Sequence, residues 1–174
     1  MKGAIVQCLG DLVKSRFGNK NWEDSLDKAG MSRTTFFTPI QNVDDQKVIK
    51  LLQSICSVLR ISSVQASEAF GDYWMNVYAP KIYDGYYRGA NSAKEFLLKM
   101  DGVHANVTDS IPFARPPRFG YEWLNDRTLI MTYKSHRGLT DIFIGLIKGV
   151  GKYYNEDLRI SKLGKDRVQI VFTR

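Results

Sequence analysis

The sequence predicts an α+β fold: a helical front half, then a back half in which four strands flank one helix. Apolar residues recur at three- and four-residue spacing up to position 111, alternate with polar or small ones after Pro116-Pro117, and return to helical spacing over 142–150. The chain has 174 residues, of which 44% are hydrophobic and 25% charged. These values are typical of a single globular domain, which we expect to span residues 1–174.

Three helices are expected before residue 60. The first follows the apolar positions 5–17 and stops at Gly18. Asn21 is predicted to cap the second, which carries acidic residues in its first turn and ends near Gly30. Asp44 and Asp45 are predicted to open the third.

Two further helices complete the front half. Ser62 and Gln65 have the spacing of a capping box, and Pro80 is predicted to end the helix that they open. The predicted inner face of this helix consists of Ala66, Phe70, Trp74 and Tyr78. Asn91 is predicted to open the next helix, which runs to about residue 110.

The back half is predicted to be β-β-α-β-β. Alternation predicts strands over 119–123, 129–133, 158–163 and 168–172, and the apolar spacing of 142–150 predicts the helix between the second and third strands. A run of strands behind a run of helices is typical of one compact α+β domain.

Charge and cysteine usage exclude several classes of protein. The net charge of +7 is spread along the chain without a run of five like charges, which indicates a mildly basic surface and no nucleic-acid partner. Cys8 and Cys56 form no CxxC motif, which argues against structural zinc and leaves a single disulfide open. The N-terminus is no signal peptide, and no segment is long and apolar enough for a membrane span, so we expect a cytoplasmic protein without a membrane partner.

His104 is the first candidate for chemistry. It stands in an apolar line with Leu97, Met100, Val107 and Ile111 on the fifth helix. Either it is a core histidine with a satisfied hydrogen bond, or it is a metal ligand. No second His or Cys lies one turn away, which argues against zinc, whereas haem iron needs only one protein ligand.

Two further candidate patterns follow His104 in the sequence. Tyr133, Ser135 and Arg137 would share one face of a strand over about 13 Å, and their hydroxyls and guanidinium suit a ligand with two carboxylates. The alternative is a solvated strand face. Pro116-Pro117 is either a simple break between elements or a rigid wall against a flat cofactor.

Together these residues give the chain a specific resemblance. It resembles the haem nitric oxide/oxygen-binding (H-NOX) family, bacterial relatives of the haem domain of soluble guanylate cyclase. The resemblance runs from Met1 over essentially the whole chain. Its carriers are His104 in Met-Asp-Gly-Val-His, the Pro116-Pro117 step, the Tyr-x-Ser-x-Arg triplet and the segment 143–147.

The resemblance implies haem b between a helical distal lobe and a proximal lobe that holds the sheet. It implies that His104 binds the iron, that Tyr133, Ser135 and Arg137 bind the propionates, and that Pro117 presses on the porphyrin. Asp101, one turn before the histidine, is expected to orient the imidazole. The remaining expected haem contacts are Ile5, Leu9, Trp74, Tyr78, Met100, Ile142 and Leu146.

The identity of the sensed gas is predicted from the residue at one position. Oxygen-binding members place a distal tyrosine five residues after the triplet arginine, where this chain has Ile142. A hydrocarbon side chain donates no hydrogen bond to oxygen, so the resemblance implies a sensor of nitric oxide, with carbon monoxide as a second gas. An oxygen-binding H-NOX is the alternative if Trp74 or Tyr78 donates instead.

The resemblance also implies a signalling partner in trans, such as a histidine kinase or a cyclic-di-GMP enzyme. We expect no enzyme, because the chain lacks a paired-carboxylate motif, a nucleophile elbow and a P-loop, and Gly149-Val-Gly151 lacks the third glycine of a dinucleotide motif. The family's cysteine-rich zinc site is not expected either, since no cysteine follows Cys56. A haem-free small-molecule or protein-binding module is the other alternative, although it would need neither His104 nor the triplet.

Overall fold

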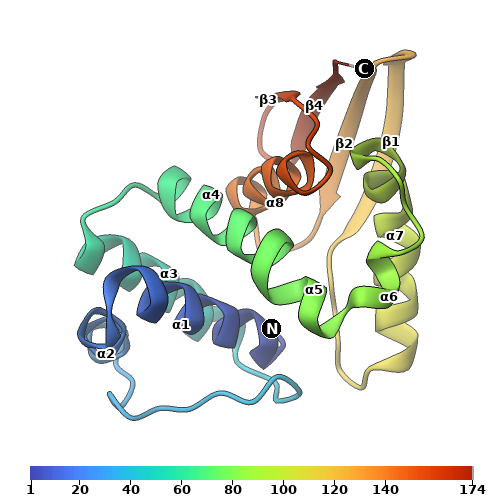
Figure 1. Cartoon of the computed structure of the whole chain (residues 1–174). Coiled ribbons are helices and arrows are strands. Elements are labelled where there is room, and N and C mark those ends of the chain that lie inside the picture. The colour runs from blue at the N-terminus through green and yellow to red at the C-terminus, as the bar shows by residue number, and fades with distance from the viewer. Residues whose placement is uncertain (174) are drawn as a thin grey trace. The chain divides into compact units, whose positions relative to one another are not determined.

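The computed structural model describes residues 1–173, so the predicted end of the domain, Arg174, lies outside the described residues. It divides into two compact units, residues 1–66 and residues from 67 onward. Each unit is described by itself below. Blue to cyan marks the first unit in Figure 1, and green to red the second.

The first unit is helical. It contains α1 (Gly3–Phe17), α2 (Asn19–Lys28), α3 (Asp45–Leu59) and the start of α4 (Ser63–Tyr73). Helix α2 packs against both α1 and α3. All three helices were predicted, α1 and α3 from their apolar spacing, and their inward faces supply the core residues Val6, Leu12, Val13, Trp22, Leu26, Val48, Leu51 and Ile55.

The helix starts in this unit test the predicted caps. The side chain of Asp44 accepts a hydrogen bond from the Lys47 amide, as a cap should. The prediction for Asn21 was wrong: α2 begins at Asn19, and its cap is Gly18, three residues earlier, whose φ of 88° lets the chain turn there. The side-chain Nδ2 of Asn21 instead donates to the backbone carbonyl of Phe17.

The two cysteines also lie in the first unit. Cys8 and Cys56 are both free thiols, so the disulfide that the sequence left open is not formed. Burial raises the pKa of the Cys8 thiol far above its usual range.

The capping box of α4 is confirmed in both directions. The Ser62 amide donates to Oε1 of Gln65 at 2.9 Å, and the Gln65 amide donates to Oγ of Ser62 at 3.2 Å. The two bonds satisfy donors at the start of the helix that would otherwise lack partners.

Pro80 does not end this helix, contrary to the prediction. The chain continues through the π-helical turn η1 (Trp74–Tyr78) into α5 (Ala79–Ile82). Pro80 then lies in the first turn of α5, the part of a helix in which proline is most common. The rings of Trp74 and Tyr78 still stack, with centroids 5.4 Å apart.

Two helices follow before the sheet. Helix α6 (Asp84–Tyr87) was not predicted, whereas α7 (Ala93–Ser110) matches the predicted fifth helix. Its cap is Ser92 and not Asn91: the Ser92 side chain accepts from the Glu95 amide at 3.1 Å. Asn91 contributes its backbone N–H, which donates to the Glu95 carboxylate.

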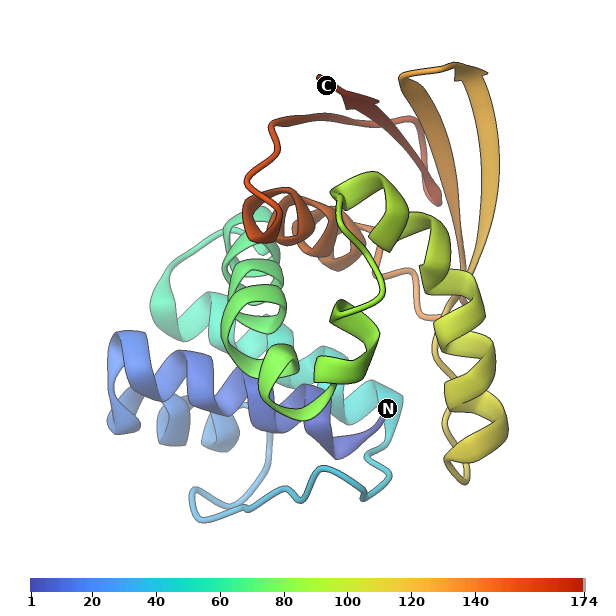
Figure 2. The same cartoon turned by 45° about the vertical axis from the view of Figure 1, so that its right-hand side comes forward.

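All four predicted strands form one antiparallel sheet. They are β1 (Arg118–Asn125), β2 (Thr128–Lys134), β3 (Leu158–Lys162) and β4 (Arg167–Phe172), in the spatial order β1-β2-β4-β3. The predicted helix between β2 and β3 is α8 (Thr140–Tyr153). Helix α7 contacts β1, α8 contacts β3, and the helices contact each other, so both cover one face of the sheet. Figure 2 shows α7 running beside the β1–β2 hairpin.

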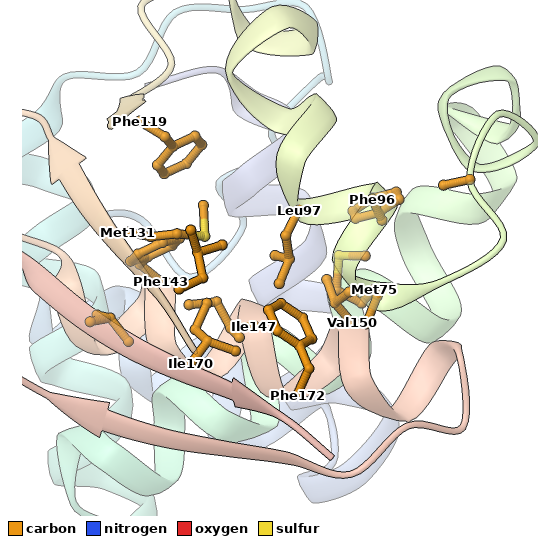
Figure 3. Packing of buried hydrophobic residues seen from close by; sticks show 14 of the residues in the cluster. Met75, Phe96, Leu97, Phe119, Met131, Phe143, Ile147, Val150, Ile170 and Phe172 are labelled. Carbon is orange, nitrogen blue, oxygen red and sulfur yellow. The ribbon is translucent and has the colours of Figure 1, made fainter. Parts of the chain in front are cut away.

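The core of the second unit lies between this face and the helices. Met131 from β2, Ile170 and Phe172 from β4, and Ile147 and Val150 from α8 meet there, each at most 2% exposed (Figure 3). Residues of α7 and η1 complete it, including Leu97 and Met75. The core therefore joins the helix that carries His104 to the helix that carries Ile142.

Glycines let α4 and α8 approach closely. A Cβ atom on Gly71 would lie 2.0 Å from the backbone of Gly145, and one on Gly145 would lie 2.0 Å from the carbonyl of Ser67. No side chain fits such a contact, so glycine is required at both positions. Within residues 1–173, no helix is long and apolar enough to cross a membrane.

Candidate haem site

His104 lies in the second half of α7 and is held by one backbone group. Its Nδ1 atom lies 2.7 Å from the carbonyl oxygen of Pro117. Because a carbonyl only accepts, Nδ1 must carry the proton, and the lone pair is then on Nε2. Burial lowers the pKa of His104, which favours the neutral imidazole that binds metals.

Asp101 does not orient the imidazole, contrary to the prediction. Its carboxylate accepts from Nε and Nη2 of Arg118, at 2.8 and 2.6 Å, and from the Phe119 amide at 2.7 Å. The Arg118 hydrogen bonds hold the pKa of Asp101 at about 2. The carboxylate thus fastens α7 to the start of β1, and the backbone of Pro117 takes the orienting role.

An aromatic cluster connects His104 with the triplet. The imidazole lies 5.2 Å from the Phe119 ring, measured between centroids, and Phe119 stacks on Phe143 of α8 at 5.0 Å. Tyr133 also stacks on Phe143, with the ring centroids 5.5 Å apart. Phe119 and Tyr133 are direct partners in the β1–β2 register, which brings them together.

The three triplet residues do not share one strand face, contrary to the prediction. Tyr133 is buried in β2, but β2 ends at Lys134, and Ser135 and Arg137 follow in the loop to α8. The chain leaves the sheet there because α8 already begins at Thr140, with Gly138 turning at a φ of 64°. Ser135 Oγ accepts from the Arg137 amide at 3.3 Å.

The loop nevertheless brings the triplet to the proline step. Nη1 of Arg137 donates to the carbonyl of Arg115 at 2.7 Å, directly before Pro116-Pro117, and Pro117 in turn holds His104. The three patterns that the sequence predicted as a site are therefore joined by contacts, although they lie up to 33 positions apart.

Tyr121 is a residue of this region whose contact the sequence did not reveal. Its hydroxyl donates to the carbonyl of Leu97 at 2.9 Å and accepts from the amide of Asp101 at 3.2 Å. Burial raises the pKa of Tyr121, so the phenol keeps its proton. The alternation of β1 placed Phe119 and Tyr121 on the inward face, which was the only available signal.

The expected distal residues of the second unit lie on two helices in contact. Trp74 is half-buried and Tyr78 buried, both on η1; Ile142 and Leu146 are half-buried on consecutive turns of α8. Asn76 of η1 donates to the carbonyl of Gly149 in α8 at 3.3 Å, which joins the helices.

The remaining expected haem contacts are distributed over both units. Met100 is half-buried on α7 and packs against the core of the second unit. Ile5 and Leu9 lie on α1, in the first unit, where Leu9 is buried and Ile5 half-buried.

Comparisons with known proteins agree with this fold. The family model described as "Haem-NO-binding" matches residues 2–162. Two Caenorhabditis elegans relatives are soluble guanylate cyclase gcy-32, 27% identical over 97% of the chain, and gcy-34, 26% identical over 95%. The chain covers only 25% of the length of each relative.

Solved structures give the same result. An oxygen-binding H-NOX domain related to soluble guanylate cyclases, in its oxygen complex, has a TM-score of 0.84 and 25% identity, and the match covers 100% of this chain and 96% of that one. An unliganded iron(II) H-NOX mutant from K. algicida has a TM-score of 0.86 at 22% identity, over 100% and 97% of the two chains. These matches confirm the predicted α+β fold, and the family match confirms the prediction that the cofactor is haem. The chain belongs to the haem-NO-binding family, the H-NOX domains, which are haem-based gas sensors related to soluble guanylate cyclase.

Proposed function

We propose that residues 1–174 form a single H-NOX domain that senses nitric oxide and signals to a partner protein without catalysing a reaction itself. The observation that carries this proposal is the hydrogen bond between Nδ1 of His104 and the carbonyl of Pro117. It fixes the tautomer whose Nε2 can bind iron, and such fixing by a partner of the other nitrogen is usual for metal-binding histidines.

The other side chains fit the same cofactor. Arg137, Ser135 and Tyr133 are the donors proposed for the two propionates; a guanidinium is the strongest of these partners for a carboxylate. Pro117 offers a rigid ring beside the imidazole that its carbonyl holds. When bound, haem would supply an iron that binds the gas and that, with nitric oxide, would bind the imidazole of His104 less tightly.

The mechanical consequence lies in the protein. While His104 is bound to the cofactor, it connects the second half of α7 to that cofactor. Once the imidazole is released, this connection is lost. Helix α7 then keeps its contacts with β1 but can change its position at His104. The changed surface is what we propose a partner such as a histidine kinase or a cyclic-di-GMP enzyme reads.

Ile142 supports nitric oxide over oxygen. Its side chain is hydrocarbon at the position proposed for a distal donor, and Leu146 one turn later is hydrocarbon too. The oxygen-binding alternative depends on Trp74 and Tyr78, which stack on each other and each carry one polar hydrogen.

An anaerobic absorption spectrum of the reduced protein tests the proposal, repeated with nitric oxide and, separately, with air. We expect a five-coordinate ferrous haem that binds nitric oxide and forms no stable oxygen complex. A stable oxygen complex would overturn the gas assignment. Absence of a haem band after reconstitution would overturn the sensor itself and favour the haem-free binding module.

A matched pair of histidine variants tests the ligand. His104→Gly should bind haem only when free imidazole is supplied. His136→Gly removes the other histidine of the chain, which is exposed, and should bind haem as the unaltered protein does. If His104→Gly binds haem normally without imidazole, His104 is not the ligand.

A further inference from the structure

One rung of α7 is shared with a side chain of the sheet. The carbonyl of Leu97 and the amide of Asp101 are four positions apart, so they are each other's partners in an α-helix. The Tyr121 hydroxyl of β1 bonds to both, at 2.9 and 3.2 Å. A helix bends where a side chain enters its hydrogen-bond ladder, and this entry lies one turn before His104.

A second feature weakens the helix at the same place. Gly102 directly follows the shared rung, and a Cβ atom there would meet nothing within 4 Å. No close packing therefore requires glycine at this position. Because glycine in the middle of a helix is less stable than alanine, Gly102 makes α7 easier to deform just before His104.

Burial changes at the same point. The buried residues of α7 are Ala93, Phe96 and Leu97, so none lies beyond the residue whose carbonyl forms the shared rung. The Ala93 amide also donates to the Glu156 carboxylate at 3.0 Å. From Gly102 to Ser110 every residue is half-buried or exposed. The first segment of α7 is thus part of the core, while the segment that carries His104 lies at its edge.

We infer that Tyr121 is a positioning residue for His104: its hydroxyl fixes the point about which the 102–110 segment of α7 moves and holds the 93–101 segment in place. This inference rests on the proposed function, because release of His104 from the cofactor is what sets the segment moving. It adds that the movement is confined to the part of α7 that follows Tyr121's contact.

Amide hydrogen exchange of the haem-loaded protein tests the inference. The tied state is the unaltered ferrous protein, and the untied state is His104→Gly loaded with haem and free imidazole. We expect exchange in the untied state to rise several-fold over 102–110 and to stay unchanged over 93–101. A rise over the whole helix would overturn the inference.

Tyr121→Phe, made in both states, tests the role of the hydroxyl. Without it, we expect the rise in exchange to extend into 93–101. Tyr153→Phe is the matched control, because it removes a phenol hydroxyl from an exposed ring at the end of α8 and should leave the boundary at residue 101. An unchanged boundary in Tyr121→Phe would show that its contact is only structural.

Gly102→Ala gives a second test that keeps Tyr121. The substitution is made in both the tied and the untied state, and a stiffer helix should reduce the rise in exchange over 102–110 between them. A rise as large as the one measured with Gly102 in place would contradict the inference. Absorption spectra of the same samples separate the two proposals. A protein that binds no haem fails as a sensor, whereas a loaded protein without the boundary at residue 101 overturns only the role of Tyr121.

Discussion

The imidazole of His104 and the backbone carbonyl of Pro117 share a hydrogen bond of 2.7 Å. The proposed iron ligand is therefore held by the residue proposed to press on the porphyrin. Because the acceptor is a main-chain atom, a substitution at position 117 changes the ring without removing the bond. The two roles of Pro117 can thus be separated by mutation.

Arg137→Gln should weaken haem retention. The guanidinium is the proposed charged partner of a propionate, and a hydrogen bond to a charged group contributes about 1.5–3 kcal/mol. We expect haem to transfer to an acceptor such as apomyoglobin about ten to a hundred times faster. Lys134→Gln removes an exposed cation three positions earlier and should leave the rate unchanged. Equal rates in the two variants would remove Arg137 from the site.

Ile142→Tyr should confer a stable oxygen complex. A phenol at this position can donate a hydrogen bond to bound oxygen, which the hydrocarbon side chain cannot. The measurement is the absorption spectrum of the reduced protein in air, followed over hours. Ile142→Phe supplies a similar ring without the hydroxyl and should form no stable complex. If both variants bind oxygen, the hydrogen bond is not the determinant.

Gly145→Ala should destabilise the second unit. A Cβ atom would lie 2.0 Å from the carbonyl of Ser67, so α4 and α8 would have to move apart. Overpacking of this kind costs about 1–3 kcal/mol of unfolding free energy. Urea unfolding measures it, with Gly85→Ala as the control, because a Cβ there meets nothing within 4 Å. A Gly145→Ala protein as stable as the control would show that the helices can separate without cost.

The ion pair of Asp101 with Arg118 predicts a dependence of stability on pH. The folded pKa of Asp101 is about 2, below the ordinary value of about 3.9. A lowered pKa stabilises the fold above the unfolded value, and this contribution is lost as the pH falls from about 4 towards 2. Asp101→Asn should therefore be less stable than the unaltered protein at pH 6, with a difference that shrinks on acidification.

Unfolding midpoints at several pH values measure this difference. Asp157→Asn is the control, because it removes a carboxyl that is exposed. A difference between Asp101→Asn and the unaltered protein that stays constant down to pH 2 would mean that the ion pair does not stabilise the fold.

The sequence determined the elements and the candidate residues. Helical spacing is a local property, so it located α1, α3, α7 and α8, and alternation located the four strands. The capping box of Ser62 and Gln65 was readable because both of its hydrogen bonds join residues three positions apart. His104, the proline step and the triplet are likewise short patterns in the chain.

Only the tertiary structure decided the partners of these residues. The carbonyl of Pro117 has no side-chain signal, and the Tyr121 hydroxyl reaches α7 only because β1 packs against that helix. Asp101 binds Arg118, because the start of β1 meets α7 there. The π-helical turn that keeps Pro80 within a helix was equally hidden. Spacing along a chain encodes periodicity, whereas a hydrogen-bond partner depends on which elements pack together and in which register.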